Sequence, residues 1–268
     1  MRFVWLNGAV RTFDEARISP ADRGFTLGDG VFETMRVCRG RIVHLPRHMA
    51  RLADGGQVLG MPVPCADEVQ AAAVGLLRAC GLENAVLRLS VARGEGPRGL
   101  LPPVPAHPTV LLTAAPGAFC VSQVQVVTSR QIRRDEVSPL SYIKSLNYLP
   151  AILARQEAER QGAQDALLLN TQGRVAESTI SNLVVATDAG LVTPYVAEGA
   201  LAGVARAWLL ERGLVREGQL APADLRQAGG VWLVNSLSLR VVTALDGQAL
   251  PVDGVRTAEL EHCLRHGA

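Results

Sequence analysis

Lysine is the residue that this sequence almost lacks. Of 27 basic residues only Lys144 is a lysine, and all the others are arginine. Most surface positions that accept arginine also accept lysine, so a pressure such as nucleotide bias has removed lysine from every position but one. An ammonium group can lose its proton when it is desolvated, whereas a guanidinium stays charged at any ordinary pH. Lys144 is therefore a candidate reactive amine, and chance survival on a solvated face is the alternative.

The low net charge and the absence of long apolar runs exclude several classes of protein. The net charge is only +2 and the arginines are scattered among acidic residues, so neither a nucleic-acid nor a membrane-surface partner is indicated. No apolar run is long enough to span a membrane, and Asn7-Gly8 interrupts the N-terminal apolar stretch too early for a secretion signal. We therefore expect a protein without membrane segments.

The cysteines form no pattern typical of a disulfide framework or a zinc site. They are odd in number, widely spaced and without a CxxC pair, and no Cys/His spacing fits zinc. We therefore expect reduced thiols, a cytoplasmic protein and no metal. The five positions are Cys38, Cys65, Cys80, Cys120 and Cys263.

The 268 residues are 48% hydrophobic, which is enough for one large or two modest domains. Asn7-Gly8 is a hairpin signal, and helical and extended patterns are mixed without a regular βαβ alternation. We predict two α+β domains, 1–114 and 119–268, joined by a linker at 115–118. Strands are predicted at 2–6, 9–13, 31–37, 41–45, 84–92, 108–114, 121–128, 165–170, 180–187, 190–193, 231–235 and 240–245. Helices are predicted at 46–60, 66–80, 146–161, 203–212, 222–228 and 254–265, and a Gly/Pro-rich functional loop at 94–108.

Three segments of the second half carry residues suited to cofactor chemistry. Lys144 precedes an apolar helix, where a desolvated lysine can form a Schiff base and then transfer protons. Glu177, in RVAESTISN, can pair with a protonated pyridine nitrogen, although a surface or helix-cap carboxylate is the commoner role. Gly203, Val204 and Ala205 begin a predicted helix, whose N–H groups favour phosphate, although an ordinary helix entry has the same pattern.

Two further residues are candidates for the same phosphate. Arg51, in RHMARL, would supply a charged clamp, and Ser236, in VNSLSLR, would supply a hydroxyl. Each residue also fits a routine position, a helix-surface cation and a turn residue respectively. His48 is more simply a structural histidine than a metal ligand.

The order of these motifs resembles the class IV pyridoxal-phosphate aminotransferase family (fold type IV), which includes branched-chain and D-amino-acid transaminases and aminodeoxychorismate lyase. The resemblance runs almost end to end, through FTLGDGVFETMRV, RHMARL, ARGEGPRG, YIKSLN, VAESTISN, GVAR and VNSLSLR. It implies a two-domain α+β, D-amino-acid-aminotransferase-like fold with pyridoxal 5'-phosphate between the domains. It also implies a homodimer whose active site is shared between subunits.

The resemblance assigns a role to each candidate. Lys144 would be the Schiff-base lysine and proton carrier, on the C-terminal domain with the phosphate site, and Glu177 would be the partner of the pyridine nitrogen. Arg98, on the loop 94–108, would reach into the neighbouring subunit's site. The phosphate would be held by Arg51, by the backbone of Gly203, Val204 and Ala205, and by the Ser236 turn.

The choice of reaction depends on substrate contacts. D-amino-acid transaminases carry a tyrosine in the GDGVYE-like segment and an Arg-x-His pair on the loop, where this chain has Phe32, Arg98 and Leu100. Losing those two donors costs a bound carboxylate roughly 1.5–3 kcal/mol each. ARGEGPRGL and VNSLSLRVV look instead like the RGxGxRGY loop and NSLMGLRPV turn of aminodeoxychorismate lyases. Leu100 in place of tyrosine, Ala205 in place of threonine and a shorter Asn235 turn depart from that pattern.

The resulting hypothesis is a lyase that converts 4-amino-4-deoxychorismate to 4-aminobenzoate and pyruvate for folate synthesis. Lys144 would remove the C4 proton, and Thr34 would donate a proton toward the leaving enolpyruvyl group unless strand alternation turns it into the core. Arg98 would contact a substrate carboxylate, and Phe32 would line the substrate site. The alternative is a transaminase of D-amino or branched-chain amino acids.

Overall fold

The computed structural model describes residues 2–266 and divides the chain into two compact units. Unit 1 contains the residues up to Ala118 together with Ile143–Asn147, and unit 2 contains Phe119–Tyr142 and the residues from Tyr148 onward. Unit 1 combines helices with an antiparallel sheet, and unit 2 combines helices with a mixed sheet. The predicted α+β class and two-part organisation are therefore confirmed.

Unit 1 is built on a six-stranded antiparallel sheet with the order β2-β1-β6-β5-β3-β4. The hairpin predicted at Asn7-Gly8 joins the first two strands, and both residues have positive φ, as this tight turn requires. The strands are β1 (Phe3–Leu6), β2 (Ala9–Thr12), β3 (Gly30–Cys38), β4 (Arg41–Ile42), β5 (Ala85–Ala92) and β6 (Thr109–Pro116).

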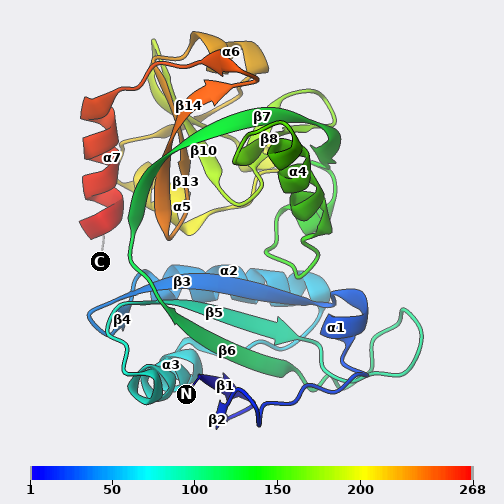
Figure 1. Ribbon diagram of the computed structural model, residues 1–268. Helices are drawn as coiled ribbons and strands as arrows, with labels where there is room; N and C mark the ends of the chain where they lie inside the picture. The colour runs from blue at the N-terminus through cyan, green and yellow to red at the C-terminus, as the bar shows by residue number, and fades with distance from the viewer. Residues whose placement is uncertain (1, 267–268) are drawn as a thin grey trace. The chain divides into compact units, whose positions relative to one another are not determined.

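Helices cover one face of this sheet (Figure 1). α2 (Leu45–Leu59) and α3 (Ala66–Cys80) pack on alternate residues of β3 and β5, because successive side chains of a strand point to opposite faces. Val31, Met35 and Leu87 belong to this buried core. The intervening residues, including Phe32, Thr34 and Arg88, therefore belong to the other face. The short helix α1 (Arg23–Leu27) precedes β3.

Unit 2 contains a nine-stranded mixed sheet. The strand order is β12-β11-β10-β13-β14-β7-β8-β9, with β15 paired to β14, and the sheet curls so that β9 also contacts β10 and β11. The strands are β7 (Cys120–Arg134), β8 (Asp165–Asn170), β9 (Val175–Ser178), β10 (Asn182–Thr187), β11 (Gly190–Pro194), β12 (Arg216–Gly218), β13 (Gly230–Val234), β14 (Ser238–Leu245) and β15 (Gln248–Ala249).

The helices of unit 2 bury different parts of that sheet. α4 (Leu149–Arg160) packs on β7 and β8, α6 (Pro222–Gln227) contributes to the core of the curled sheet, and α5 (Val204–Glu211) packs with α7 (Gly254–His266). Two single turns of 3₁₀-helix lie at η1 (Pro139–Ser141) and η2 (Val196–Glu198). Within residues 2–266, no helix has the length and apolar character needed to cross a bilayer.

Several elements differ from those predicted: β7 continues to Arg134, whereas the predicted strand ended at 128, and α1 and β9 were not predicted. Two further differences concern the domain boundary and the lysine segment. β6 continues to Pro116, so part of the predicted linker is paired strand. α4 begins at Leu149, and the five residues 143–147 cluster with unit 1, whereas the prediction placed the lysine segment in the C-terminal domain. The reason is hydrogen bonding: the Phe32 N–H donates to the Lys144 carbonyl at 2.9 Å, and the Leu146 N–H donates to the Gly30 carbonyl at 2.9 Å.

Candidate functional site

Lys144 is held against β3 by its own backbone. The hydrogen bonds at Gly30 and Phe32 flank a bridge between Val31 and Ser145, so the segment runs along the strand as an added edge. This pairing fixes where the lysine side chain starts. Its ammonium nitrogen lies 4.4 Å from the centre of the Phe32 ring.

A second cation approaches the same ring. The guanidinium carbon of Arg88, on β5, lies 3.9 Å from the centre of Phe32. Phe32 is almost fully buried, and aromatic rings attract cations at such distances. The apolar Phe32 thus has an amine and a guanidinium beside it, a combination able to bind a molecule that carries an acidic group near an amine-reactive carbon.

Thr34 shares the face of Phe32 and not the core face. It lies two residues further along β3, directly opposite Arg88 in the strand register, and it is half-buried. The alternative that the sequence left open, a threonine turned into the core, is therefore not what the fold shows. Thr34 is placed beside the Phe32 and Arg88 pair.

Arg51 lies on α2, where its guanidinium engages a carboxylate. Its Nε and Nη2 atoms donate to the two oxygens of Glu33 at 2.7 and 2.6 Å, and Nδ1 of His48 lies 2.7 Å from the same carboxylate. Burial alone would raise the pKa of Glu33, but the hydrogen bonds from His48 and Arg51 and the guanidinium charge outweigh it and lower the pKa to about 2.

For the base His48, burial has the opposite effect and lowers the pKa. This effect is larger than the increase caused by the Glu33 carboxylate, so the pKa of His48 lies below its usual value. The neutral ring therefore donates its Nδ1 proton to Glu33. His48 is thus a buried hydrogen-bond partner of Glu33. Arg51, the arginine expected to hold the phosphate, is thus oriented by Glu33, the buried carboxylate that follows Phe32 in the sequence.

The loop 94–108 is fixed near its tip by Arg23. The buried Arg23 guanidinium donates to the carbonyls of Gly99 and Leu100 at 3.0 and 2.8 Å, and its Nε donates to Asp29 at 2.9 Å. Arg98 itself is exposed on this loop. The backbone beside Arg98 is therefore held, whereas its side chain is presented outward from unit 1.

Glu177, on β9 of unit 2, is held by two donors. Nε of Arg134 lies 3.1 Å from one carboxylate oxygen, and the Leu201 N–H donates to the other at 3.0 Å. Arg134 also donates to the carbonyls of Gly199 and Ser141 at 2.8 and 2.7 Å. Glu177 is buried and fixed in orientation, unlike the surface carboxylate that the sequence offered as the simpler interpretation.

The segment that precedes α5 is tied to the same carboxylate. Asn182 donates from Nδ2 to the Leu201 carbonyl at 2.8 Å, while Glu177 accepts from the N–H of that residue. Gly203 is the N-cap of α5 and supplies no capping side chain, and Val204 and Ala205 are the first helical residues. A Cβ on Gly203 would lie 1.9 Å from Oδ1 of Asn182, so no larger residue fits there without movement.

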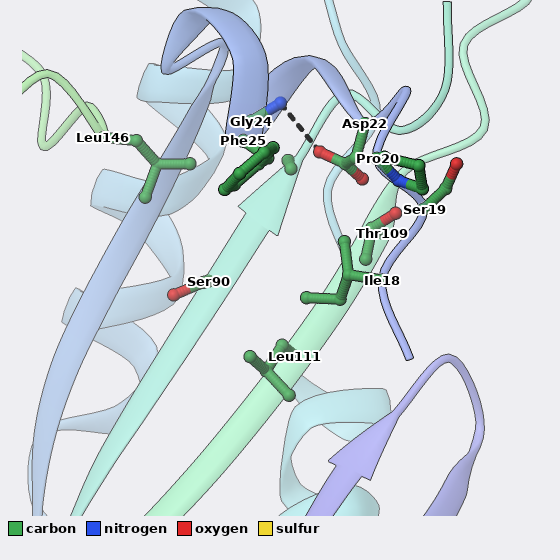
Figure 2. A pocket seen from close by; sticks show the side chains of 11 residues that line it. Ile18, Ser19, Pro20, Asp22, Gly24, Phe25, Ser90, Thr109, Leu111 and Leu146 are labelled. Atoms are coloured by element: carbon green, nitrogen blue, oxygen red, sulfur yellow. Dashed lines mark hydrogen bonds between the residues drawn. The ribbon is translucent and has the colours of Figure 1, made fainter. Parts of the chain in front are cut away.

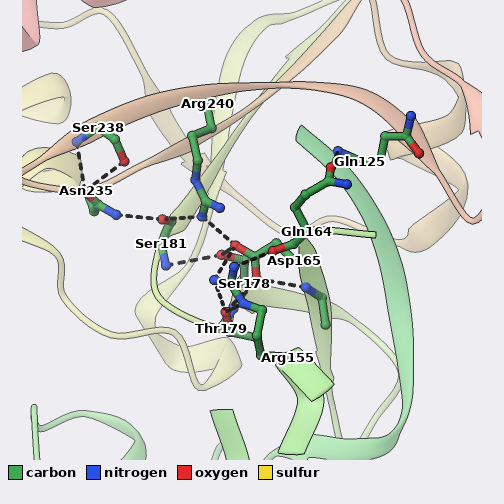
Figure 3. Close-up of polar contacts among 11 residues, drawn as sticks. Gln125, Arg155, Gln164, Asp165, Ser178, Thr179, Ser181, Asn235, Ser238 and Arg240 are labelled. Carbon is green, nitrogen blue, oxygen red and sulfur yellow. Dashed lines mark hydrogen bonds and ion pairs between the residues drawn. The ribbon is translucent and has the colours of Figure 1, made fainter. Parts of the chain in front are cut away.

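Ser236 lies in the turn between β13 and β14, and it is half-buried. The Asn235 side chain shapes this turn by accepting from the N–H groups of Leu237 and Ser238 at 2.9 Å each. Its Nδ2 donates at 3.0 Å to Ser181, which follows Glu177 by four residues (Figure 3). Glu177, the start of α5 and the Ser236 turn are therefore linked within unit 2.

The structure places the ten predicted residues in two sets. Lys144, Phe32, Thr34, Arg51 and Arg98 belong to unit 1, whereas Glu177, Gly203, Val204, Ala205 and Ser236 belong to unit 2. Sequence reasoning missed Arg88 and Arg134. Strand alternation puts Arg88 in phase with Phe32 once the register is known, but no local signal distinguishes Arg134 among the many arginines.

Comparisons with known proteins cover most of the chain. The sequence model of class IV amino-transferases matches residues 30–245. A protein of Methanocaldococcus jannaschii, named as a candidate branched-chain-amino-acid aminotransferase, is 31% identical over 258 residues, covering 92% of this chain and 89% of its own length.

Solved structures extend the similarity. Branched-chain amino acid aminotransferase of Escherichia coli superposes with a TM-score of 0.90 and 26% identity, covering 97% of this chain and 92% of its own. A protein of Legionella pneumophila, named as a candidate 4-amino-4-deoxychorismate lyase, gives a TM-score of 0.86 and 28% identity, covering 94% and 96%. Transaminase and lyase names thus both occur among similar structures.

Proposed function

Because this chain belongs to the class IV aminotransferase family, we propose that it is a transaminase of D-amino or branched-chain amino acids. We place this function ahead of the lyase that its loop motifs suggested. Two observations support this order. The M. jannaschii relative and the E. coli structure both carry branched-chain aminotransferase names. The second observation is the pair of cations beside Phe32.

That pair carries the proposal because it matches the two functional groups of an amino acid. Lys144 and Arg88 lie 4.4 and 3.9 Å from the centre of one buried ring. An α-amino acid has an amine and a carboxylate on the same carbon. An arginine is well suited to bind the carboxylate through two parallel hydrogen bonds, while the amine reacts at the position of the lysine. Arg88 thus supplies what the missing tyrosine and histidine supply in D-amino-acid transaminases.

The enzyme's cofactor is pyridoxal 5'-phosphate. When bound, it supplies an aldehyde that reacts with amines and a ring that takes up electrons as a bond at the amino carbon breaks. The donor set of this chain fits it: the fixed carboxylate of Glu177 for the pyridine nitrogen, and the uncapped start of α5 for the phosphate.

The remaining roles fall to named side chains. We assign Lys144 to hold the cofactor aldehyde and then to move a proton at the substrate's amino carbon. Arg51, oriented by Glu33, and the Ser236 turn would hold the phosphate with the backbone of residues 203–205. Phe32 would exclude water beside the reacting amine, because its buried ring fills that side of Lys144.

A homodimer is part of the proposal because apolar surface of unit 1 stays uncovered. A pocket of about 530 Å³ is lined mainly by apolar residues, with Asp22 and three hydroxyl side chains among them (Figure 2). Its apolar lining includes Ile18, Pro20, Leu111, Leu146 and Phe25, which is 79% exposed. Leu100 and Leu101, at the loop tip, are 84% and 87% exposed. Exposed apolar surface of this kind is typical of protein interfaces. We propose a second copy of this chain as its partner.

The shared active site has a direct test. If Arg98 of one subunit serves the site of the other, Lys144→Ala and Arg98→Ala homodimers will each be nearly inactive. The dimer formed from one subunit of each variant will recover up to about half of the activity of the wild-type dimer, because one of its two sites has both residues intact and the other has neither. Sedimentation analysis checks the dimer itself, and a mixture that stays inactive contradicts the sharing.

The reaction is tested with purified enzyme and paired substrates. We expect release of a keto acid from D-amino or branched-chain amino acids only when 2-oxoglutarate or pyruvate is present as amino acceptor. Comparing D- and L-leucine with D- and L-alanine separates the two transaminase classes. The lyase remains the second candidate, supported by the L. pneumophila structure. Formation of 4-aminobenzoate from 4-amino-4-deoxychorismate without any keto acid would establish the lyase and reject the transaminase.

A further inference from the structure

A buried carboxylate in unit 2 lies at the centre of a polar network that none of the assigned roles explains. Asp165, the first residue of β8, is fully buried, and the guanidinium of Arg240 on β14 contacts one of its oxygens. Nη2 of Arg155 on α4 lies 3.3 Å from the same oxygen. Two cations from different elements thus meet one carboxylate (Figure 3).

The same carboxylate holds the loop that follows Glu177. Its Oδ1 atom accepts from the Thr179 hydroxyl at 2.6 Å, and its Oδ2 atom accepts from the Ser178 hydroxyl at 3.3 Å. The Ser178 hydroxyl also accepts from the Ser181 N–H at 3.2 Å. The hydroxyl residues of the ESTIS segment are therefore oriented by Asp165, and Glu177 is the residue directly before them.

The network continues to the turn that carries Ser236. Nη2 of Arg240 donates both to Asp165 and to the Ser181 hydroxyl, the latter at 3.1 Å, and Nδ2 of Asn235 donates to the same hydroxyl at 3.0 Å. Asn235 shapes the Ser236 turn with its side-chain oxygen. One carboxylate is therefore connected on one side to the loop after Glu177 and on the other to the Ser236 turn.

We propose that Asp165 is a positioning residue for both ends of the cofactor, acting on the pyridine end through the loop behind Glu177 and on the phosphate end through Arg240, Ser181 and Asn235. The inference rests on the proposed roles of Glu177 and Ser236. Cooperation of this kind is expected from a buried polar network, in which every member depends on its neighbours for orientation. Asp165 touches neither substrate nor cofactor in this scheme.

The test measures cofactor binding. Asp165→Asn keeps the shape but removes the charge that orients Arg240 and Arg155. We expect it to weaken binding of pyridoxal 5'-phosphate at least tenfold and to shift the visible absorption band of the bound cofactor. Ser181→Ala removes only the bridging hydroxyl, and we expect it to weaken binding about threefold without loss of fold.

A double-mutant cycle supplies a readout that general destabilisation would not move. If the two residues act through one network, the effects of Asp165→Asn and Ser181→Ala on the cofactor Kd will be less than multiplicative in the double variant. The matched control is Glu157→Gln, which removes another buried unit 2 carboxylate, bonded to Ser129 and the Arg130 N–H. We expect it to lower stability and leave the cofactor Kd unchanged.

The outcomes separate this inference from the proposed function. A wild-type protein that binds no cofactor would reject the proposed function and this inference together. A wild-type protein that binds it, with an unchanged Kd and spectrum in Asp165→Asn, would reject the inference alone. If Asp165→Asn does not fold, Ser181→Ala decides, because an unchanged cofactor Kd in that variant also overturns the proposal.

Discussion

Glu33 offers a quantitative test of the site in unit 1. Its side chain is fully buried, and its carboxylate accepts from Arg51 and His48. A shift of the pKa from 4.5 to about 2 corresponds to about 3 kcal/mol of favourable interaction in the folded state. Replacing it in Glu33→Gln leaves the Arg51 guanidinium, which is only 11% exposed, without its counter-ion. Loss of one partner from such a pair costs about 3–5 kcal/mol.

The sign of the pH dependence follows from the lowered pKa. A depressed acid pKa stabilises the folded state fully above the unfolded value, and that stability is lost as the pH falls toward the folded value. The stability difference between wild type and Glu33→Gln should therefore be largest near pH 7. It should shrink by about 2 kcal/mol by pH 3, because the unfolded carboxyl group is protonated first.

Urea denaturation at pH 7, 5, 4 and 3, followed by tryptophan fluorescence at constant cofactor concentration, measures this difference. Glu83→Gln is the control, since its side chain is exposed, and its unfolding free energy should stay within about 0.5 kcal/mol of wild type. A gap between wild type and Glu33→Gln that is equally large at pH 7 and pH 3 would refute the assignment of Glu33 as an ionised, buried partner of Arg51.

Three further substitutions test separate contacts. Gly203→Ala should weaken cofactor binding at least tenfold, measured by fluorescence titration, because its Cβ collides with Asn182; wild-type affinity would contradict the tight approach. Arg88→Leu should raise the KM for amino acids at least tenfold while the borohydride-reducible cofactor linkage at Lys144 persists; an unchanged KM would remove Arg88 from the substrate site. Arg23→Gln should speed tryptic cleavage of the loop 94–108, seen by mass spectrometry; an unchanged cleavage rate would show that the loop does not depend on it.

Local sequence patterns predicted many of the elements. The helix at 66–80 and the strand at 165–170 have the bounds expected, because their apolar residues recur with the helical period or form a short continuous buried run. The short strand β12 and the paired residues at the end of β6 were missed, because their pairing is decided by distant partners and not by their own composition.

The sequence by itself determined which residues have the chemistry for a cofactor enzyme: one lysine, one carboxylate in ESTISN and a glycine at a helix start. Their types and spacing are local properties that no packing can change. Only the tertiary structure decided which side chains lie next to these residues. Arg88 and Lys144 both approach the Phe32 ring because β5 and the segment 143–147 each pair with β3, and Arg51 faces Glu33 because α2 packs on the face of β3 opposite Phe32. Such neighbours are set by long-range pairing, which is why a linear pattern of arginines does not distinguish one from another.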